Sequence, residues 1–252
     1  MTIKAVTFDL WDTMVHDDSD EAKRAAEGLR SKRDERRHLV WQALNEIEPI
    51  DPERVSLAYD VADAGFNLVW KENHINWTVE QRLQVVLRGL GRSLPEPAMA
   101  KLIERTGAME VEISPDPIEG IGEALTTLAG RYKLAVVSDA IVTPGSGLRQ
   151  ILEKYDLKRH FSGFSFSDEV GHSKPHPSMF ETAADQLGVA LDEIVHVGDR
   201  DHNDVKGPHA IGAKAILFTG SRPDDAASTT ADAVCAQHRD LPEIVDRLAA
   251  QA

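Results

Sequence analysis

Five short apolar runs restrict this chain to a narrow range of folds. They read "IKAVTFDL", "KLAVVSDA", "GFSFSDE", "EIVHVGDR" and "AKAILFTG". Each run is apolar on both faces and ends in polar residues, which is typical of central strands in a parallel sheet that helices cover on both sides. From about residue 117 onward such runs alternate with helical segments. The pattern therefore predicts an α/β fold with a doubly wound, Rossmann-like parallel sheet.

A segment of about a hundred residues between the first two runs lacks any strand pattern and reads as helices. Pro52 stands where a helix tolerates it, at the first position, and Thr78 with Gln81 forms a capping box. We expect four helices, which begin at Ser19, Asp51, Thr78 and Pro95. The first is expected to run unbroken to about residue 48. The predicted organisation is an α/β catalytic core of residues 1–15 and 115–252, interrupted by an α-helical bundle of residues 16–114.

The charge and the cysteine content exclude several classes of partner. A formal net charge of -14 repels nucleic acid and anionic membrane surfaces. A single cysteine allows no intramolecular disulfide, and neither a signal peptide nor an apolar run long enough to cross a membrane is visible. These features favour a soluble cytoplasmic protein, in which a small anionic substrate would need a local positive site or a metal. They leave the oligomeric state open.

Polar residues that could carry chemistry follow the ends of the apolar runs. In an open parallel sheet, ligands bind beyond the carboxyl ends of the strands, so residues at these ends converge on one site. Lys174, in the segment "GHSKPHP", adds a positive charge to an otherwise acidic set. The other members of the set are Asp9, Ser138, Asp139, Asp168, Asp199 and Asp204.

Four ordered segments, "FDLWDT", "VVSDA", "HSKPHPSMF" and "VGDRDHNDVKG", resemble the motifs of the haloacid dehalogenase superfamily. That superfamily includes phosphatases, phosphomutases and dehalogenases. The segments span almost the whole predicted α/β part, and the helical insert lies where the family often carries a mobile cap. The resemblance therefore implies a hydrolase that forms a covalent aspartyl intermediate.

The resemblance also implies a role for each matching residue. Asp9 would be the nucleophile, and Ser138 and Lys174 would bind the transferring group and neutralise its charge. Thr13 would steady the turn after Asp9, and Trp11 and Asp139 would contact substrate. A Mg²⁺ ion, which prefers oxygen ligands, would be held by the carboxylates of Asp9, Asp199 and Asp204 and the backbone carbonyl of Trp11.

Trp11 departs from the phosphatase pattern of this family. Family phosphatases usually place an aspartate two residues after the nucleophile, where it protonates the leaving group and later activates water. Tryptophan cannot exchange that proton at neutral pH. Without a general acid at this position, the rate with poor leaving groups is expected to fall by about 10²–10⁴-fold. Asp12 is an alternative proton donor, although it lies one residue further along the chain.

Three functions remain open from the sequence. We favour a Mg²⁺-dependent phosphatase, because "VGDRDHND" retains the Gly-Asp pair that metal-free family dehalogenases usually lack. The alternative is a 2-haloacid dehalogenase, since that branch carries an aromatic residue at the position of Trp11. The third is a phosphate-ligand or protein-binding module with weakened turnover. A dehalogenase would need a cation for the substrate carboxylate, but we interpret the charged helix face of Arg30, Arg33 and Arg37 as salt-bridged and solvated.

Overall fold

A computed structural model describes residues 2–251, which divide into two compact units. The helical unit comprises Asp18–Ser114 and Ala140–Ile151, and the α/β unit comprises the other described residues. The sequence had placed residues 16, 17 and 140–151 in the opposite units. Residues 140–151 group with the helical unit because Asn76 and Arg82 donate to the carbonyls of Ala140 and Ile141, at 3.3 and 3.1 Å.

The α/β unit is built on a six-stranded, wholly parallel sheet with strand order β3-β2-β1-β4-β5-β6. The chain first adds β2 and β3 on one side of β1 and then adds β4 to β6 on the other. This order confirms the predicted doubly wound fold and includes a short sixth strand that the sequence did not reveal. The strands are β1 (Ala5–Phe8), β2 (Lys133–Ser138), β3 (Gly163–Phe166), β4 (Ile194–Gly198), β5 (Lys214–Phe218) and β6 (Ala233–Cys235).

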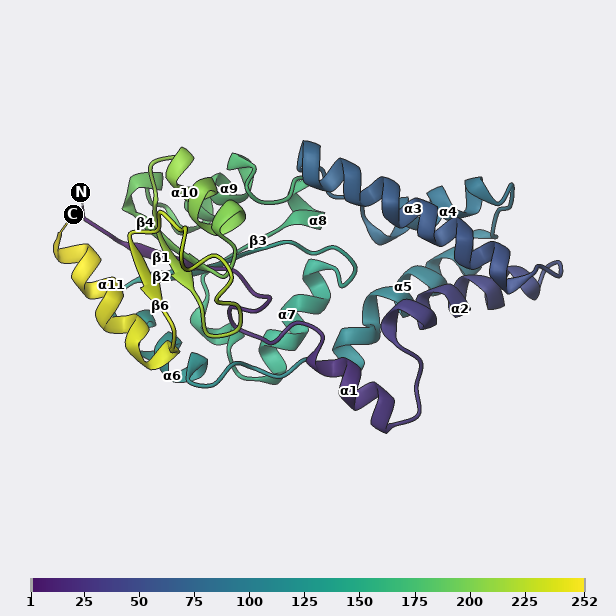
Figure 1. Ribbon diagram of the computed structural model, residues 1–252, viewed down its shortest axis with the longest axis horizontal. Coiled ribbons are helices and arrows are strands. Elements are labelled where there is room, and N and C mark those ends of the chain that lie inside the picture. Colours follow the sequence, from purple (N-terminus) through teal and green to yellow (C-terminus); the bar gives the residue numbers. More distant parts are fainter. Residues whose placement is uncertain (1, 252) are drawn as a thin grey trace. The chain divides into compact units, whose positions relative to one another are not determined.

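Helices cover both faces of this sheet (Figure 1). On one face, α9 (Pro177–Leu187) packs Met179, Phe180 and Ala183 against β1 and β2, and α10 (Gly207–Ala210) lies beside it. On the other face lie α6 (Ile121–Ala129) and α11 (Leu241–Ala250), while the single turn α8 (Ser167–Val170) follows β3. All four residues of β1 are buried, as its apolar sequence requires.

The helical unit consists mainly of α1 (Ser19–Ala26), α2 (Lys32–Asn45), α3 (Pro52–Asn73), α4 (Val79–Gly89) and α5 (Glu96–Glu112). Most of α7 (Gly145–Lys154) also belongs to it. The capping box of Thr78 and Gln81 begins α4, and Asp51 caps α3 ahead of Pro52, as predicted. The expected long first helix is wrong. It breaks between α1 and α2, where Gly28 adopts a φ of 71° that a helix does not accommodate.

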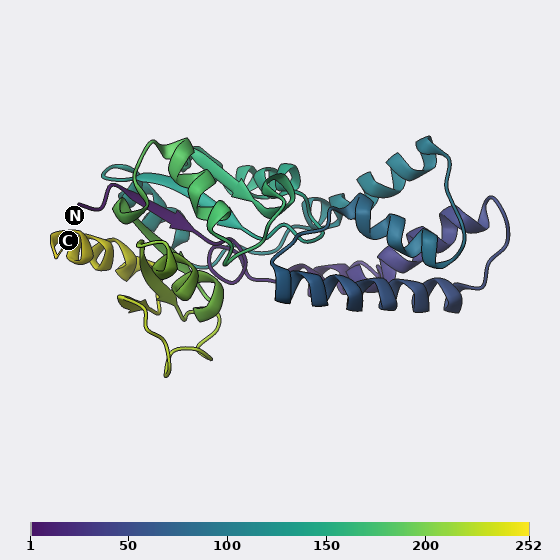
Figure 2. The same ribbon diagram turned by 90° about the horizontal axis from the view of Figure 1, so that it is seen from above.

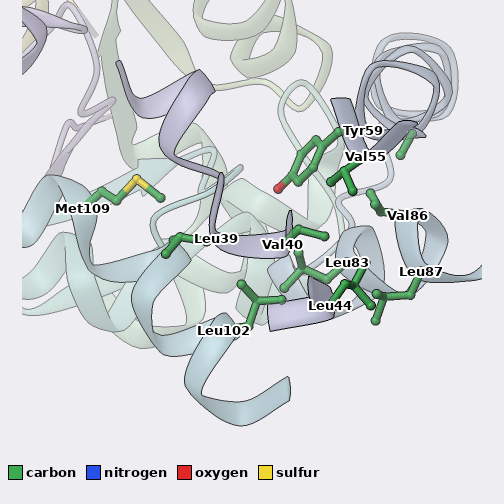
Figure 3. Packing of buried hydrophobic residues seen from close by; sticks show 11 residues of the cluster. Leu39, Val40, Leu44, Val55, Tyr59, Leu83, Val86, Leu87, Leu102 and Met109 are labelled. Atoms are coloured by element: carbon green, nitrogen blue, oxygen red, sulfur yellow. The ribbon is translucent and has the colours of Figure 1, made fainter. Parts of the chain in front are cut away.

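Apolar side chains from α2, α3, α4 and α5 form the core of the helical unit (Figure 3). Leu44 of α2, Val55 of α3 and Leu83 of α4 are almost wholly buried there. Two arginines of α2, Arg33 and Arg37, both pair with Asp60, while Arg30, which precedes α2, pairs with Glu35. These pairs confirm the salt-bridged interpretation, but Arg30 lies outside the helix and Arg37 is buried, so the expected solvated helix face is wrong for these two residues. No helix in the described part of the chain is both long and apolar enough to span a membrane.

A buried ion-pair network joins α1, α2 and α5 within the helical unit. The Lys32 ammonium lies 2.8 Å from both Asp20 and Glu110 and 2.9 Å from Asp18. Burial by itself would lower the pKa of Lys32, but Glu110, Asp20 and Asp18 outweigh it and raise that pKa. Glu110 also accepts a hydrogen bond from Thr143. The Lys32 ammonium and Glu110 thus connect segments that lie far apart in the sequence.

We expect Lys32→Met to lower the free energy of unfolding by about 3–5 kcal/mol, because it leaves the buried carboxylates of Asp20 and Glu110 unpaired. The control is Lys101→Met on an exposed part of α5, which should change stability by less than about 0.5 kcal/mol. Urea titration measures both variants. Equal stabilities for the two would show that the network contributes little.

A second buried titratable group, His238, supports the turn that follows β1. Its Nε2 donates to the carbonyl of Thr13 at 2.7 Å, and its ring stacks on Phe218 with the centroids 4.3 Å apart. Burial lowers the pKa of His238 to about 4, although the bond to Thr13 opposes this shift. As the pH falls below about 6.5, the unfolded chain binds a proton that the folded chain does not take up.

We therefore expect stability to be greatest above pH 6.5 and to fall by as much as about 3 kcal/mol toward pH 4 because of His238 alone. His238→Gln removes the titration and keeps an N–H donor. Urea titrations at pH 7 and pH 5 should show a smaller loss of stability in this variant than in the wild type. Parallel losses would exclude His238 as the cause.

Candidate active site

The strand ends of the α/β unit place the predicted site residues together, around the point where the strand order reverses. Asp9 follows β1, Ser138 ends β2 and Asp139 follows it, and Asp199 follows β4. Asp204 lies on the π-helical turn Asp201–Lys206 that comes next. Since β1 lies between β2 and β4, these residues are brought to one edge of the sheet.

A lysine and two carboxylates form the centre of the site. The Lys174 ammonium lies 2.8 Å from Asp9 Oδ1 and 2.6 Å from Asp204 Oδ1, and all three side chains are buried. The Lys174 backbone N–H donates to Asp139 Oδ1 at 2.9 Å, which holds the loop before α9 against the end of β2. Burial alone would lower the pKa of Lys174, but Asp204 and Asp9 outweigh it and raise that pKa. Lys174 is therefore a permanent positive charge beside Asp9.

Asp204 is held from several directions. Its Oδ1 also lies 3.1 Å from His196 Nε2, and its Oδ2 accepts the Arg200 N–H at 3.0 Å. Although burial would raise the pKa of Asp204, Lys174 and His196 outweigh it and lower that pKa, so the carboxylate stays ionised. Gly198 makes room for this carboxylate, because a Cβ at position 198 would lie 2.3 Å from Asp204 Cγ.

His196 and Thr7 are the main supports that the sequence reasoning missed. His196 lies in the middle of β4 and bridges Asp204 to the Thr7 hydroxyl, with its Nδ1 2.8 Å from Thr7 Oγ1. Both residues are fully buried. The signal was a single polar residue inside each apolar run, in "AVTF" and "IVHVG". A buried strand rarely tolerates such a residue unless it has a partner.

Asp9, Asp199 and Asp204 offer three carboxylate oxygens that lie within 4.8 Å of one another. Burial, together with the charges of Asp9 and Asp204, raises the pKa of Asp199 to about 7. Among the described residues, Asp199 Oδ1 has no hydrogen-bond partner although it is buried. A hard divalent cation would relieve the repulsion and bind this free oxygen. The arrangement therefore fits Mg²⁺.

Two of the buried hydroxyls that lack partners among the described residues lie at the strand ends of the site. They belong to Ser138 at the end of β2 and Thr13 in the turn after β1. Both side chains are fully buried, yet neither hydroxyl donates a hydrogen bond to, or accepts one from, any group in the described chain. A buried hydroxyl without a partner is costly, so a ligand that supplies one is expected to be favoured.

The turn after Asp9 determines what Trp11 and Asp12 can do. Trp11 Nε1 donates to the backbone carbonyl of Asp139 at 3.2 Å, so its indole braces the end of β2. Asp12 adopts a left-handed conformation, with a φ of 52°, and its Oδ1 accepts the Asp17 N–H at 3.1 Å. The Asp12 carboxylate thus stabilises the loop, which argues against it as a substitute proton donor.

Searches among known proteins agree with this geometry. The chain is 37% identical over 112 residues to a phosphoserine phosphatase of Thermus thermophilus, covering 43% of this chain and 44% of that protein. It is 36% identical over 106 residues to haloacid dehalogenase-like hydrolase domain-containing protein 3 of Mus musculus, covering 42% and 40%. The matches thus span less than half the length of these two curated relatives.

Solved structures share the whole fold. A 2-haloacid dehalogenase from Pseudomonas syringae superposes with a TM-score of 0.70 at 22% identity, covering 98% of this chain and 99% of that one. A HAD phosphatase from Thermococcus onnurineus gives 0.64 at 21% identity, covering 96% and 98%. The family model for haloacid dehalogenase-like hydrolases matches residues 3–212. The chain therefore belongs to the haloacid dehalogenase-like hydrolases.

Proposed function

We propose that this hydrolase is a Mg²⁺-dependent phosphatase that acts on a small phosphorylated metabolite through an aspartyl-phosphate at Asp9. The observation that carries the proposal is the cluster of Asp9, Asp199 and Asp204, three buried carboxylates with their oxygens within 4.8 Å. Curated relatives named as phosphatases support the same activity, among them the phosphoserine phosphatase and a phosphoglycolate phosphatase of Escherichia coli. We further propose that the helical unit acts as a cap that selects the substrate and excludes water.

In the proposed reaction, an Asp9 carboxylate oxygen attacks the phosphorus of the substrate. A bond from Asp9 to phosphorus forms, and the bond from phosphorus to the leaving oxygen breaks with its electron pair on that oxygen. A water molecule then attacks the phosphorus, and the bond from phosphorus to the Asp9 oxygen breaks with its electron pair on that oxygen. The Asp9 carboxylate is regenerated, and the proton of the water leaves with the released phosphate. Lys174 pairs with Asp9 Oδ1, so the other Asp9 oxygen is the one available for attack.

The remaining residues stabilise charge and orient the substrate. The unpartnered Ser138 hydroxyl would donate to a phosphoryl oxygen, and the Lys174 ammonium would balance the negative charge of the transferring group. The Trp11 indole and the bond from His238 to the Thr13 carbonyl would hold the turn. The Asp139 carboxylate would position Lys174 by accepting its backbone N–H. Held by Asp9, Asp199, Asp204 and the Trp11 carbonyl, Mg²⁺ would supply positive charge for the phosphoryl oxygens.

Trp11 limits the substrates of this reaction. The only N–H of its side chain donates to the Asp139 carbonyl, and an indole cannot release a proton near neutral pH. Because Asp12 is engaged with Asp17, neither residue is placed to protonate the leaving group. We therefore propose substrates whose leaving group is already a weak base, such as acyl phosphates and aryl phosphates.

One observation favours a second candidate, a 2-haloacid dehalogenase. A halide leaves carbon without a proton, so an aromatic residue at position 11 would cost this reaction nothing. The retained Asp199, with a buried oxygen that lacks a partner in the described chain, argues for the phosphatase. The third possibility, a binding module with weak turnover, predicts thermal stabilisation by phosphate compounds without hydrolysis.

A substrate panel should distinguish these functions. With Mg²⁺, we expect hydrolysis of acyl and aryl phosphates at rates about 10²-fold or more above those of alkyl phosphates, because only the alkyl esters need a general acid. EDTA should abolish this activity, and Asp9→Asn should remove it because an amide is a poor nucleophile. Released phosphate is the readout.

Chloride release from a 2-haloacid in the presence of EDTA would instead establish the dehalogenase. Absence of turnover on the whole panel, together with a higher melting temperature in the presence of phosphate compounds, would favour the binding module.

We expect Trp11→Asp to increase hydrolysis of alkyl phosphates at least about tenfold, because it places a carboxyl group where a general acid acts. Trp11→Asn is the matched control, since it has the same size and removes the same indole but cannot donate an acidic proton. The ratio of alkyl to aryl phosphate rates should rise only in the aspartate variant. If both variants changed that ratio equally, the missing proton donor would not be what limits the wild type.

A further inference from the structure

Helix α3 of the helical unit carries two apolar faces, and only one of them is covered by the chain. Val55, Tyr59, Ala62 and Phe66 point into the unit and are buried. On the opposite side, Leu57, Val61 and Leu68 remain 66%, 65% and 56% exposed. Figure 2 shows α3 as the long blue helix of the helical unit. Helices that are apolar on two sides are usually buried on both.

The exposed residues form one continuous stripe, in contrast to scattered apolar side chains. Leu57, Val61, Ala64 and Leu68 follow one another at intervals of four, three and four positions, so they share one face of the helix over three turns. Ala64 and the neighbouring Gly65 are small, which lets a second helix approach closely at the middle of the stripe. This face therefore has the spacing of a helix–helix contact.

We propose that the outer face of α3 binds the same face of a second copy of this chain, with the two helices antiparallel. A two-fold axis near the middle of α3 places Leu57 against Leu68 of the second copy and Val61 against its Ala64. A contact of this kind is self-complementary, as a symmetric dimer requires. The stripe meets this condition because its leucines lie at the two ends and its smaller residues at the centre.

The charges that flank the stripe favour a second copy over an unrelated partner. Glu53 and Arg54 lie at one end of α3, on either side of the stripe, and Lys71 and Glu72 lie correspondingly at the other end. All four are exposed. An antiparallel arrangement brings Glu53 near Lys71 of the second copy, and Arg54 near its Glu72. Each dimer thus gains two pairs of each kind, so the charges beside the stripe are complementary to those of a second copy.

The size of this surface predicts a weak association. One pair of helices buries less area than the roughly 1,200 Å² of a standard specific interface, so we expect a dissociation constant in the micromolar range. The proposal depends only on α3 and is independent of the phosphatase reaction.

Disulfide trapping tests both the dimer and its direction. We would prepare two single variants, Leu57→Cys and Leu68→Cys, and oxidise each alone and in an equal mixture. The antiparallel dimer predicts a cross-link between the two different variants that is at least several-fold more abundant than either like-with-like product. Cys235 is buried and does not interfere. Like-with-like products in excess would overturn the antiparallel arrangement.

Sedimentation velocity tests the surface without any cross-link. The wild type should change from monomer to dimer as its concentration rises through the micromolar range, and Val61→Lys should weaken this association at least about tenfold. Val85→Lys, the same change at an exposed valine of α4, is the control and should associate like the wild type. Circular dichroism checks that both variants are folded.

A charge exchange completes the test. Glu53→Lys should weaken the dimer several-fold, and adding Lys71→Glu to that variant should restore it. The proposal is overturned if the wild type stays monomeric up to about 500 µM, or if Val61→Lys and Val85→Lys behave alike.

Discussion

The candidate site depends on one buried ammonium group, that of Lys174. Two carboxylates from different segments lie within 3 Å of it: Asp9, which follows β1, at 2.8 Å and Asp204, on the turn after β4, at 2.6 Å. Buried carboxylates of this kind repel one another strongly, and removing their shared cation would leave charge in a place that water cannot reach. Lys174 therefore keeps the nucleophile and the acidic loop in one site, although they lie almost two hundred residues apart.

The supports of this centre come from ordinary features of a parallel sheet. The carboxyl ends of β1, β2 and β4 bring Asp9, Ser138 and Asp199 to one edge, while the missing side chain of Gly198 admits Asp204. His196 and Thr7 then link Asp204 to the interior of the sheet. The repulsion that remains among the carboxylates explains why a divalent cation suits the site. The family resemblance also implies Mg²⁺ at these residues, so both lines of argument support the same proposal.

Much of the fold and most of the site follow from local patterns. The apolar runs predicted five of the six strands, and the caps at Asp51 and Thr78 marked two of the helix starts. The motif residues converge as expected because strand ends converge in any doubly wound sheet. The errors have local causes as well: Gly28 stops a helix that otherwise reads as continuous, and the three-residue strand β6 is too short to show a period.

Local sequence patterns were enough to predict the α/β fold class, the helical segment after the first strand and the motif set, which has a tryptophan at position 11. Only the tertiary structure decided what the side chains do with one another. It placed Asp12 against the Asp17 N–H, aimed the Trp11 indole at Asp139, and grouped residues 140–151 with the helical unit. It also left one face of α3 uncovered. The physical reason is that periodicity and caps are local properties of the chain, whereas hydrogen-bond partners and covered surfaces depend on segments that meet only when it folds.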